Sequence, residues 1–139
     1  QELIDRAEPG DVITPPAGTY AGPIVIDKPL TIDGKGQVTI DAGDRGTVAI
    51  LQADHTTLRG LHLTGSGDSH DTDDSCLDVR GDYNTIENIR ADNCLFGIDL
   101  KQVNHSIVRN NTVSSKNVEL GVRGDGLRLG CRALWLADL

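Results

Sequence analysis

Acidic residues gather in one short stretch of the chain, where their types could support metal chemistry. Residues 65–75 include four aspartates and one histidine: Asp68, His70, Asp71, Asp73 and Asp74. Carboxylate oxygens are ligands for calcium, and a histidine with carboxylates can bind a divalent transition metal. The spacing is not that of an EF-hand loop, which requires a glutamate at its twelfth position. The stretch predicts either a metal-binding loop or an acidic loop in contact with solvent.

Two aspartates, Asp78 and Asp99, occupy equivalent places in a repeat of 21 residues. If the repeats are stacked strands, the two carboxylates lie about 4.8 Å apart. Such a like-charge contact is unfavourable unless a cation or a base intervenes. Three basic residues accompany the pair: we expect Arg128 next to Asp99, and Arg80 in one column with Lys101.

This charged group has two interpretations. Paired carboxylates beside arginine and lysine resemble, in residue type, the sites of calcium-dependent lyases and epimerases, where a base and an acid act across a uronic acid. If the chain is such an enzyme, its catalytic residues are Asp78, Asp99, Arg80, Lys101 and Arg128. The alternative is a lattice of surface charges that compensate one another.

The spacing of apolar residues predicts the elements that position these groups. Offsets of 28, 21 and 29 residues superpose apolar residues on apolar residues, and periods of this length are typical of a solenoid. Apolar residues alternate within each repeat, which indicates short strands. Strands that meet their own copies one turn later must be parallel. We therefore predict an all-β fold, a single-stranded parallel β-helix of about four to five turns.

The offsets also predict individual contacts. Two columns should point inward: Ala49, Leu77, Ile98 and Leu127, and then Leu51, Val79, Leu100 and Leu129. Neighbouring strands should pair Thr57 with Thr85, Leu58 with Ile86, Thr85 with Ser106 and Ile86 with Ile107.

The chain is expected to be one domain over residues 1–139, with an N-terminal cap at 1–21, helical turns at 22–129 and an atypical tail or cap at 130–139. The tail is interpreted either as a helical cap or as a foreign end. Insertions at 64–75 and 114–125 fall at the same corner of the solenoid, where binding sites of repeat proteins often form. The predicted ligand or partner edge comprises Asp68, His70, Asp71, Asp73, Asp74, Arg123 and Asp125.

Composition narrows the classes of function. The net charge of −8 argues against nucleic acid and anionic membrane surfaces as partners. No apolar run reaches the ~20 residues of a membrane span, and no signal peptide is present. The four histidines are expected on different turns and faces.

The three cysteines form no CxxC pair, so we expect neither a disulfide framework nor a zinc site. The repeat places Cys94 over Asp73 and not over Cys76. We therefore interpret the thiols as free, and expect no dedicated Cu(I) site within the chain.

Several segments resemble one protein family. They are the opening at 9–34, the run at 94–100, and the stretches at 106–113 and 120–129, the last with the sequence Arg-Gly-Asp-Gly-Leu-Arg-Leu. Together they resemble NosD proteins, periplasmic right-handed β-helices that assist maturation of the copper centres of nitrous oxide reductase. The opening is also similar to that of carbohydrate-binding and sugar-hydrolase solenoids of the pectate-lyase type. NosD proteins are longer, so the chain resembles an N-terminal fragment of one.

The resemblance implies a non-enzymatic periplasmic accessory protein that works with an ABC-type transporter and nitrous oxide reductase. It implies no required cofactor, with copper or calcium as possible ligands. The alternatives are a carbohydrate-active β-helix, a uronate polysaccharide lyase or epimerase, and an inert structural solenoid. Sugar sites usually stack rings on aromatic side chains, which are scarce here. A truncated end is expected to favour an end-to-end homodimer.

Overall fold

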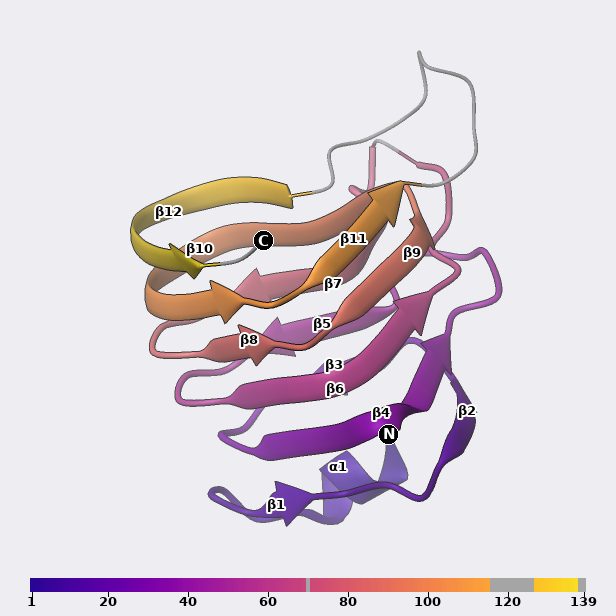
Figure 1. The fold of residues 1–139 in the computed structure, drawn as a ribbon, viewed down its shortest axis with the longest axis vertical. Helices are drawn as coiled ribbons and strands as arrows, with labels where there is room; N and C mark the ends of the chain where they lie inside the picture. Colours follow the sequence, from indigo (N-terminus) through magenta and orange to yellow (C-terminus); the bar gives the residue numbers. More distant parts are fainter. Residues whose placement is uncertain (70, 116–126, 138–139) are drawn as a thin grey trace.

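Strands one repeat apart pair side by side and in parallel along the whole computed structural model (Figure 1), which describes residues 1–69, 71–115 and 127–137. The result is a parallel β-solenoid of about four turns with almost no helix, which confirms the predicted fold class. The elements are α1 (Glu2–Arg6), β1 (Val12–Ile13), β2 (Gly18–Ala21), β3 (Ile24–Ile26), β4 (Thr31–Asp41), β5 (Ala49–Gln52), β6 (Thr57–Thr64), β7 (Ser75–Arg80), β8 (Thr85–Glu87), β9 (Arg90–Cys94), β10 (Phe96–Arg109), β11 (Thr112–Ser115) and β12 (Leu127–Ala137).

The pairings define three stacks of strands. The first runs through β3, β5, β7 and the beginnings of β10 and β12. The second runs through β1, the beginnings of β4 and β6, then β8 and the ends of β10 and β12. The third runs through β2, the ends of β4 and β6, then β9 and β11. Long strands such as β4 and β10 therefore belong to two stacks and turn a corner within their length.

The core consists of columns of aliphatic side chains, because equivalent residues of successive turns stack on one another. Ala49 pairs with Leu77 and Leu77 with Ile98, and all three are buried. Leu51, Val79 and Leu100 form the second predicted column and are fully buried. The backbones of Leu127 and Leu129 pair with Ile98 and Leu100 as predicted; the inward direction predicted for their side chains lies outside the described part of the structure.

One predicted register is wrong by a residue. The 28-residue offset holds for β6 and β8, where Thr57 pairs with Thr85 and Leu58 with Ile86. In β10, however, a bulge follows Leu100. Beyond it Thr85 pairs with Ile107 and Ile86 with Val108, not with Ser106 and Ile107. Val108 is consequently buried and Ile107 points outward.

Polar residues close the corner between the first and second stacks. His55, Tyr83 and His105 all have positive φ at this corner, a backbone region in which histidine is among the enriched residues. Their rings stack along the solenoid, with centroids 5.2 Å apart in both pairs. Beneath them the buried Asn84 accepts from the Thr56 amide and donates to the Ala53 carbonyl. Two of the histidines thus share one corner, contrary to the expectation that all would lie on different faces.

The two ends of the stack differ in structure. At the N-terminal end the Gln1 side chain bonds both the N–H and the C=O of Val25, so it occupies the place of a neighbouring strand on β3. At the other end β12 continues to Ala137 and pairs with β10. The helical alternative for the tail is therefore wrong, because the open edge of β10 offers backbone partners that a ten-residue helix lacks. Residues 138–139 lie outside the described part. No helix among the described residues is long and apolar enough to span a membrane.

Candidate functional site

The charged residues singled out in the sequence converge on one lysine. Asp99 on β10 pairs with Asp78 on β7, which confirms the predicted stacking of the two aspartates. The ammonium nitrogen of Lys101 lies 3.1 Å from Asp78 Oδ2, 3.8 Å from Asp99 Oδ2 and 3.5 Å from Asp73 Oδ2. The cation that a stacked carboxylate pair requires is therefore supplied by the chain itself. We call Asp73, Asp78, Asp99 and Lys101 the lysine cluster.

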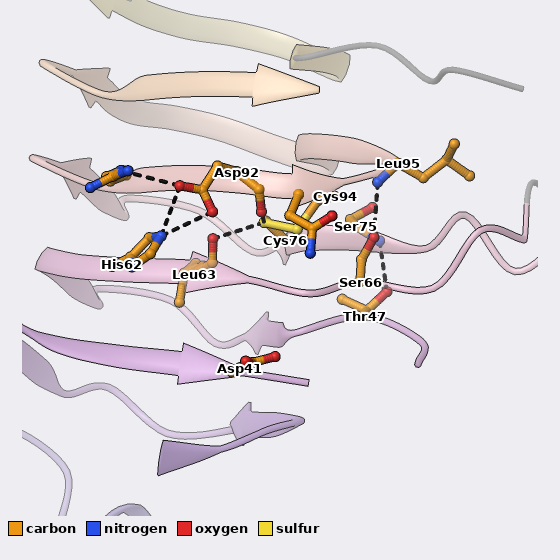
Figure 2. The surroundings of a disulfide bond; sticks show 12 residues. Asp41, Thr47, His62, Leu63, Ser66, Ser75, Cys76, Asp92, Cys94 and Leu95 are labelled. Carbon is orange, nitrogen blue, oxygen red and sulfur yellow. Dashed lines mark hydrogen bonds and ion pairs between the residues drawn. A yellow bond between two sulfur atoms is a disulfide. The ribbon is translucent and has the colours of Figure 1, made fainter. Parts of the chain in front are cut away.

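The lysine cluster is more deeply buried than a surface charge lattice would be. The expected mutual compensation of the charges is present, but Asp78 is 8% exposed and Asp99 is 2% exposed, so these two carboxylates are not at the surface. The loop 64–75 contributes Asp73 to the cluster, and its Ser66 accepts a hydrogen bond from the Leu95 amide beside β10 (Figure 2). Docking of this loop explains the burial, which the offsets between strands alone do not reveal.

The two arginines assigned to the same site behave differently from Lys101. Arg80 pairs with Gln102 across the bulge, so the predicted column of Arg80 with Lys101 is wrong. Its guanidinium is half exposed and lies 3.8 Å from Asp78 Oδ1, an oxygen that accepts no hydrogen bond from the described residues. The backbone of Arg128 pairs with Asp99 as predicted; its side chain lies outside the described part.

The acidic loop is held together by its own hydrogen bonds. Asp74 is 5% exposed and accepts hydrogen bonds from the Ser69 amide and the Thr72 hydroxyl at 3.0 and 2.6 Å. Asp68 and Asp71 are exposed. His70, Arg123 and Asp125 lie outside the described residues. Within the described residues no three His, Cys, Asp or Glu side chains are grouped so that they could hold a metal ion.

Cys76 and Cys94 form a disulfide, contrary to the prediction of free thiols (Figure 2). Cys76 begins the solenoid turn at β7, and Cys94 ends the same turn at β9, with a Cα–Cα distance of 5.5 Å. Both are fully buried, and the Cys76 sulfur lies 3.1 Å from the Leu63 carbonyl oxygen. The prediction compared residues on adjacent turns, whereas this bond crosses a corner within one turn. The side chain of the third cysteine, Cys131, lies outside the described part.

A histidine–carboxylate pair that sequence reasoning missed lies on the outer face of the third stack. Both carboxylate oxygens of Asp92 on β9 lie 2.9–3.0 Å from His62 Nε2 on β6 (Figure 2). His62 Nδ1 lies 3.3 Å from the Thr39 hydroxyl on β4. The Asp92 carboxylate can only accept, so Nε2 donates to it, and the direction of the Nδ1–Thr39 hydrogen bond follows the tautomer of the ring.

Asp92 is held as an anion by this setting. Burial raises the pKa of its carboxyl, but hydrogen bonds from His62 and Thr64 and the charges of His62 and Arg90 lower it more, so the pKa lies below its ordinary value of 3.8. The signal was in the 28-residue offset, which sets His62 beside Arg90 and brings Asp92 within reach. Together these contacts join three successive turns.

No known protein family, curated protein or solved structure matches the chain.

Proposed function

We propose that the chain is a non-enzymatic accessory module of the periplasm that assists copper-centre assembly of nitrous oxide reductase together with an ABC-type transporter. The proposal comes from the sequence resemblance to NosD proteins. The observation that supports its non-enzymatic part is the lysine cluster, in which Lys101 already compensates Asp73, Asp78 and Asp99. A cation of the chain itself therefore occupies the place that calcium or a cationic group of a substrate would need beside these carboxylates.

The disulfide supports an oxidising compartment, since disulfides persist outside the cytosol and are rare within it. A thiol titration of unfolded protein tests this part. Material exported to the periplasm should expose one thiol per chain, from Cys131, and three after reduction. Three reactive thiols in periplasmic material before reduction would show that the disulfide does not form there and would remove this support for the proposed location.

The partner edge is placed at the loop 64–75, where Asp68 and Asp71 are exposed; Arg123 and Asp125 are assigned to the same edge from sequence. An acidic edge on a chain of net charge −8 suits a basic partner surface. The test is the copper content of nitrous oxide reductase in a strain that lacks its own NosD and receives this chain.

Restored copper loading is expected for the unmodified chain. The double variant Asp68→Asn/Asp71→Asn should restore less. The matched control Glu8→Gln/Asp27→Asn removes two exposed carboxylates elsewhere and should act like the unmodified chain. Loading no better than in the empty strain would contradict the proposal. Titration with Cu(I), Cu(II) and Ca²⁺ tests separately whether the chain carries a metal itself.

A carbohydrate-active enzyme is the second candidate, and the stacked Asp78–Asp99 pair beside Lys101 and Arg80 is the observation that favours it. We expect no turnover of pectate or alginate, with or without calcium. Depolymerisation or epimerisation that disappears in Asp78→Asn/Asp99→Asn would replace the accessory role with the enzyme. An inert structural solenoid remains the outcome if the loop edge binds nothing.

A further inference from the structure

A cavity of about 230 Å³ lies at the N-terminal end of the solenoid, between α1 and the first strands. In Figure 1 this is the end where α1 lies beside β1 and β4. The walls are mostly apolar: Gln1, Glu2, Leu3, Ile4, Ile13, Pro15, Tyr20, Ile24, Ile32, Val38, Ile40 and Leu61 line the cavity. It is distinct from the lysine cluster and from the loop 64–75.

The cavity exists because the first turn is too sparse to fill the interior. β1 has only two residues and β2 has four, and the half-buried Ile13 and Tyr20 pack only partly against the core. Core side chains that face the cavity accordingly keep a small exposure, 4% for Ile24 and 6% for Ile40, whereas Leu51 on the next strand of the first stack has none. Solvent-sized space therefore reaches the apolar column at this end.

The polar groups of the wall already have partners within the protein. The Gln1 side-chain amide bonds the backbone of Val25, and Glu2 forms an ion pair with Arg6. The Tyr20 hydroxyl donates to the Pro16 carbonyl at 2.6 Å. A charged or strongly polar ligand would leave water without gaining a partner here, which is unfavourable.

We propose that this cavity binds a small, uncharged, apolar molecule larger than benzene. An engineered apolar cavity of roughly 150 Å³ stays dry and binds benzene; this cavity is larger and mostly apolar, and it opens to solvent beside the exposed Gln1, Glu2 and Leu3. Burial of the ligand removes apolar surface of both ligand and wall from water. The inference does not depend on the accessory role proposed above, and a failure of either leaves the other standing.

Titration with ethylbenzene, followed by NMR of isoleucine methyl groups, tests the proposal. Saturable shifts are expected for Ile4, Ile13 and Ile24 in the wall, with no shift of Ile107 on the outside of β10. The melting temperature should rise with ethylbenzene concentration, because a ligand of the native state stabilises it. Benzoate, a charged probe of similar size, should cause neither effect. Unchanged wall methyls at saturating ethylbenzene, or equal binding of benzoate, would overturn the proposal.

Filling the cavity separates specific binding from general partition of ethylbenzene into the protein. Ile13→Phe and, independently, Ile24→Phe should weaken ethylbenzene binding by about tenfold or more without lowering the melting temperature, since the larger ring occupies empty space. The matched control Ile107→Phe makes the same change at an exposed position and should bind ethylbenzene like the unmodified protein. Undiminished binding by a folded filling variant would show that the probe binds elsewhere.

Discussion

Lys101 is the residue on which the charged cluster depends. Replacing it by methionine removes the ammonium that faces Asp73, Asp78 and Asp99. Removing one partner of a buried ion pair typically costs about 3–5 kcal/mol, so Lys101→Met should lower the free energy of unfolding by that order in urea titrations. Arg80→Met is the control, because its half-exposed ion pair should contribute at most about 1 kcal/mol. Equal losses for both variants would contradict a central role for Lys101.

Asp92 should give the stability of the protein a defined dependence on pH. Its pKa is lowered in the folded state, so the unfolded chain binds the proton more tightly. The stabilisation is then fully present above the ordinary pKa of 3.8 and is lost as pH falls through the lowered value. Asp92→Asn should therefore be less stable than the unmodified protein near neutral pH, and the difference should vanish in strong acid.

Urea unfolding of both proteins at a series of pH values measures this difference. Asp71→Asn, at an exposed loop position, serves as the control and should differ little from the unmodified protein throughout. A gap between Asp92→Asn and the unmodified protein that stayed constant down to strong acid would show that the contact acts through packing and not through charge.

Among contacts between single residues, the sequence predicts those that join equivalent positions of adjacent turns, and it does not predict those within one turn. The Asp78–Asp99 contact follows from stacking equivalent residues of adjacent turns, and the offset that predicts it is visible in the apolar pattern. Cys76–Cys94 was missed because both residues belong to one turn and meet across a corner, where no offset relates them. His62–Asp92 does not follow from the offset alone, because the 28-residue register pairs His62 with Arg90, and Asp92 lies two residues further along β9.

Among the elements, β10 carries the sharpest test of burial. Ile98 is fully buried in the first stack, and its backbone pairs with those of Leu77 and Leu127. Ile98→Ala therefore leaves a cavity that typically costs about 2–5 kcal/mol. Ile107→Ala on the same strand, beyond the bulge and 36% exposed, should cost no more than about 0.5 kcal/mol. Chemical denaturation of the two variants measures the contrast. A loss below about 0.5 kcal/mol for Ile98→Ala would contradict the register.

The register of β10 also shows where the pattern of apolar residues stops predicting which residues pair. Strands β5 to β8 follow the 28-residue offset without interruption. The extra residue in β10 is invisible in the apolar pattern, because Ile107 and Val108 are both aliphatic and either could face inward. The structure shows which of the two faces inward. Val108 packs in the core, and the Ser106 hydroxyl accepts a hydrogen bond from the Asn84 backbone amide.

At the scale of the whole molecule, the outer edge of β12 predicts self-association. Among the described strands β12 pairs only with β10, so its outer edge offers backbone N–H and C=O groups to another chain. We expect end-to-end dimers at high concentration. Light scattering on the protein with and without residues 130–139 measures the mass. A strict monomer in both forms, without aggregation, would contradict this expectation.

The disulfide has a mechanical consequence. By joining the start of β7 to the end of β9, it converts one turn of the solenoid into a covalently closed ring. A chain pulled by its two ends can unwind from either side but cannot release the segment that joins Cys76 to Cys94, whose sequence separation is 18. At about 3.3–3.6 Å per extended residue, the fully stretched oxidised protein should be shorter than the reduced one by roughly 60 Å. Single-molecule extension with and without reductant would measure this difference. Forced unfolding from either end of the chain would stop at this covalent ring until the disulfide is reduced.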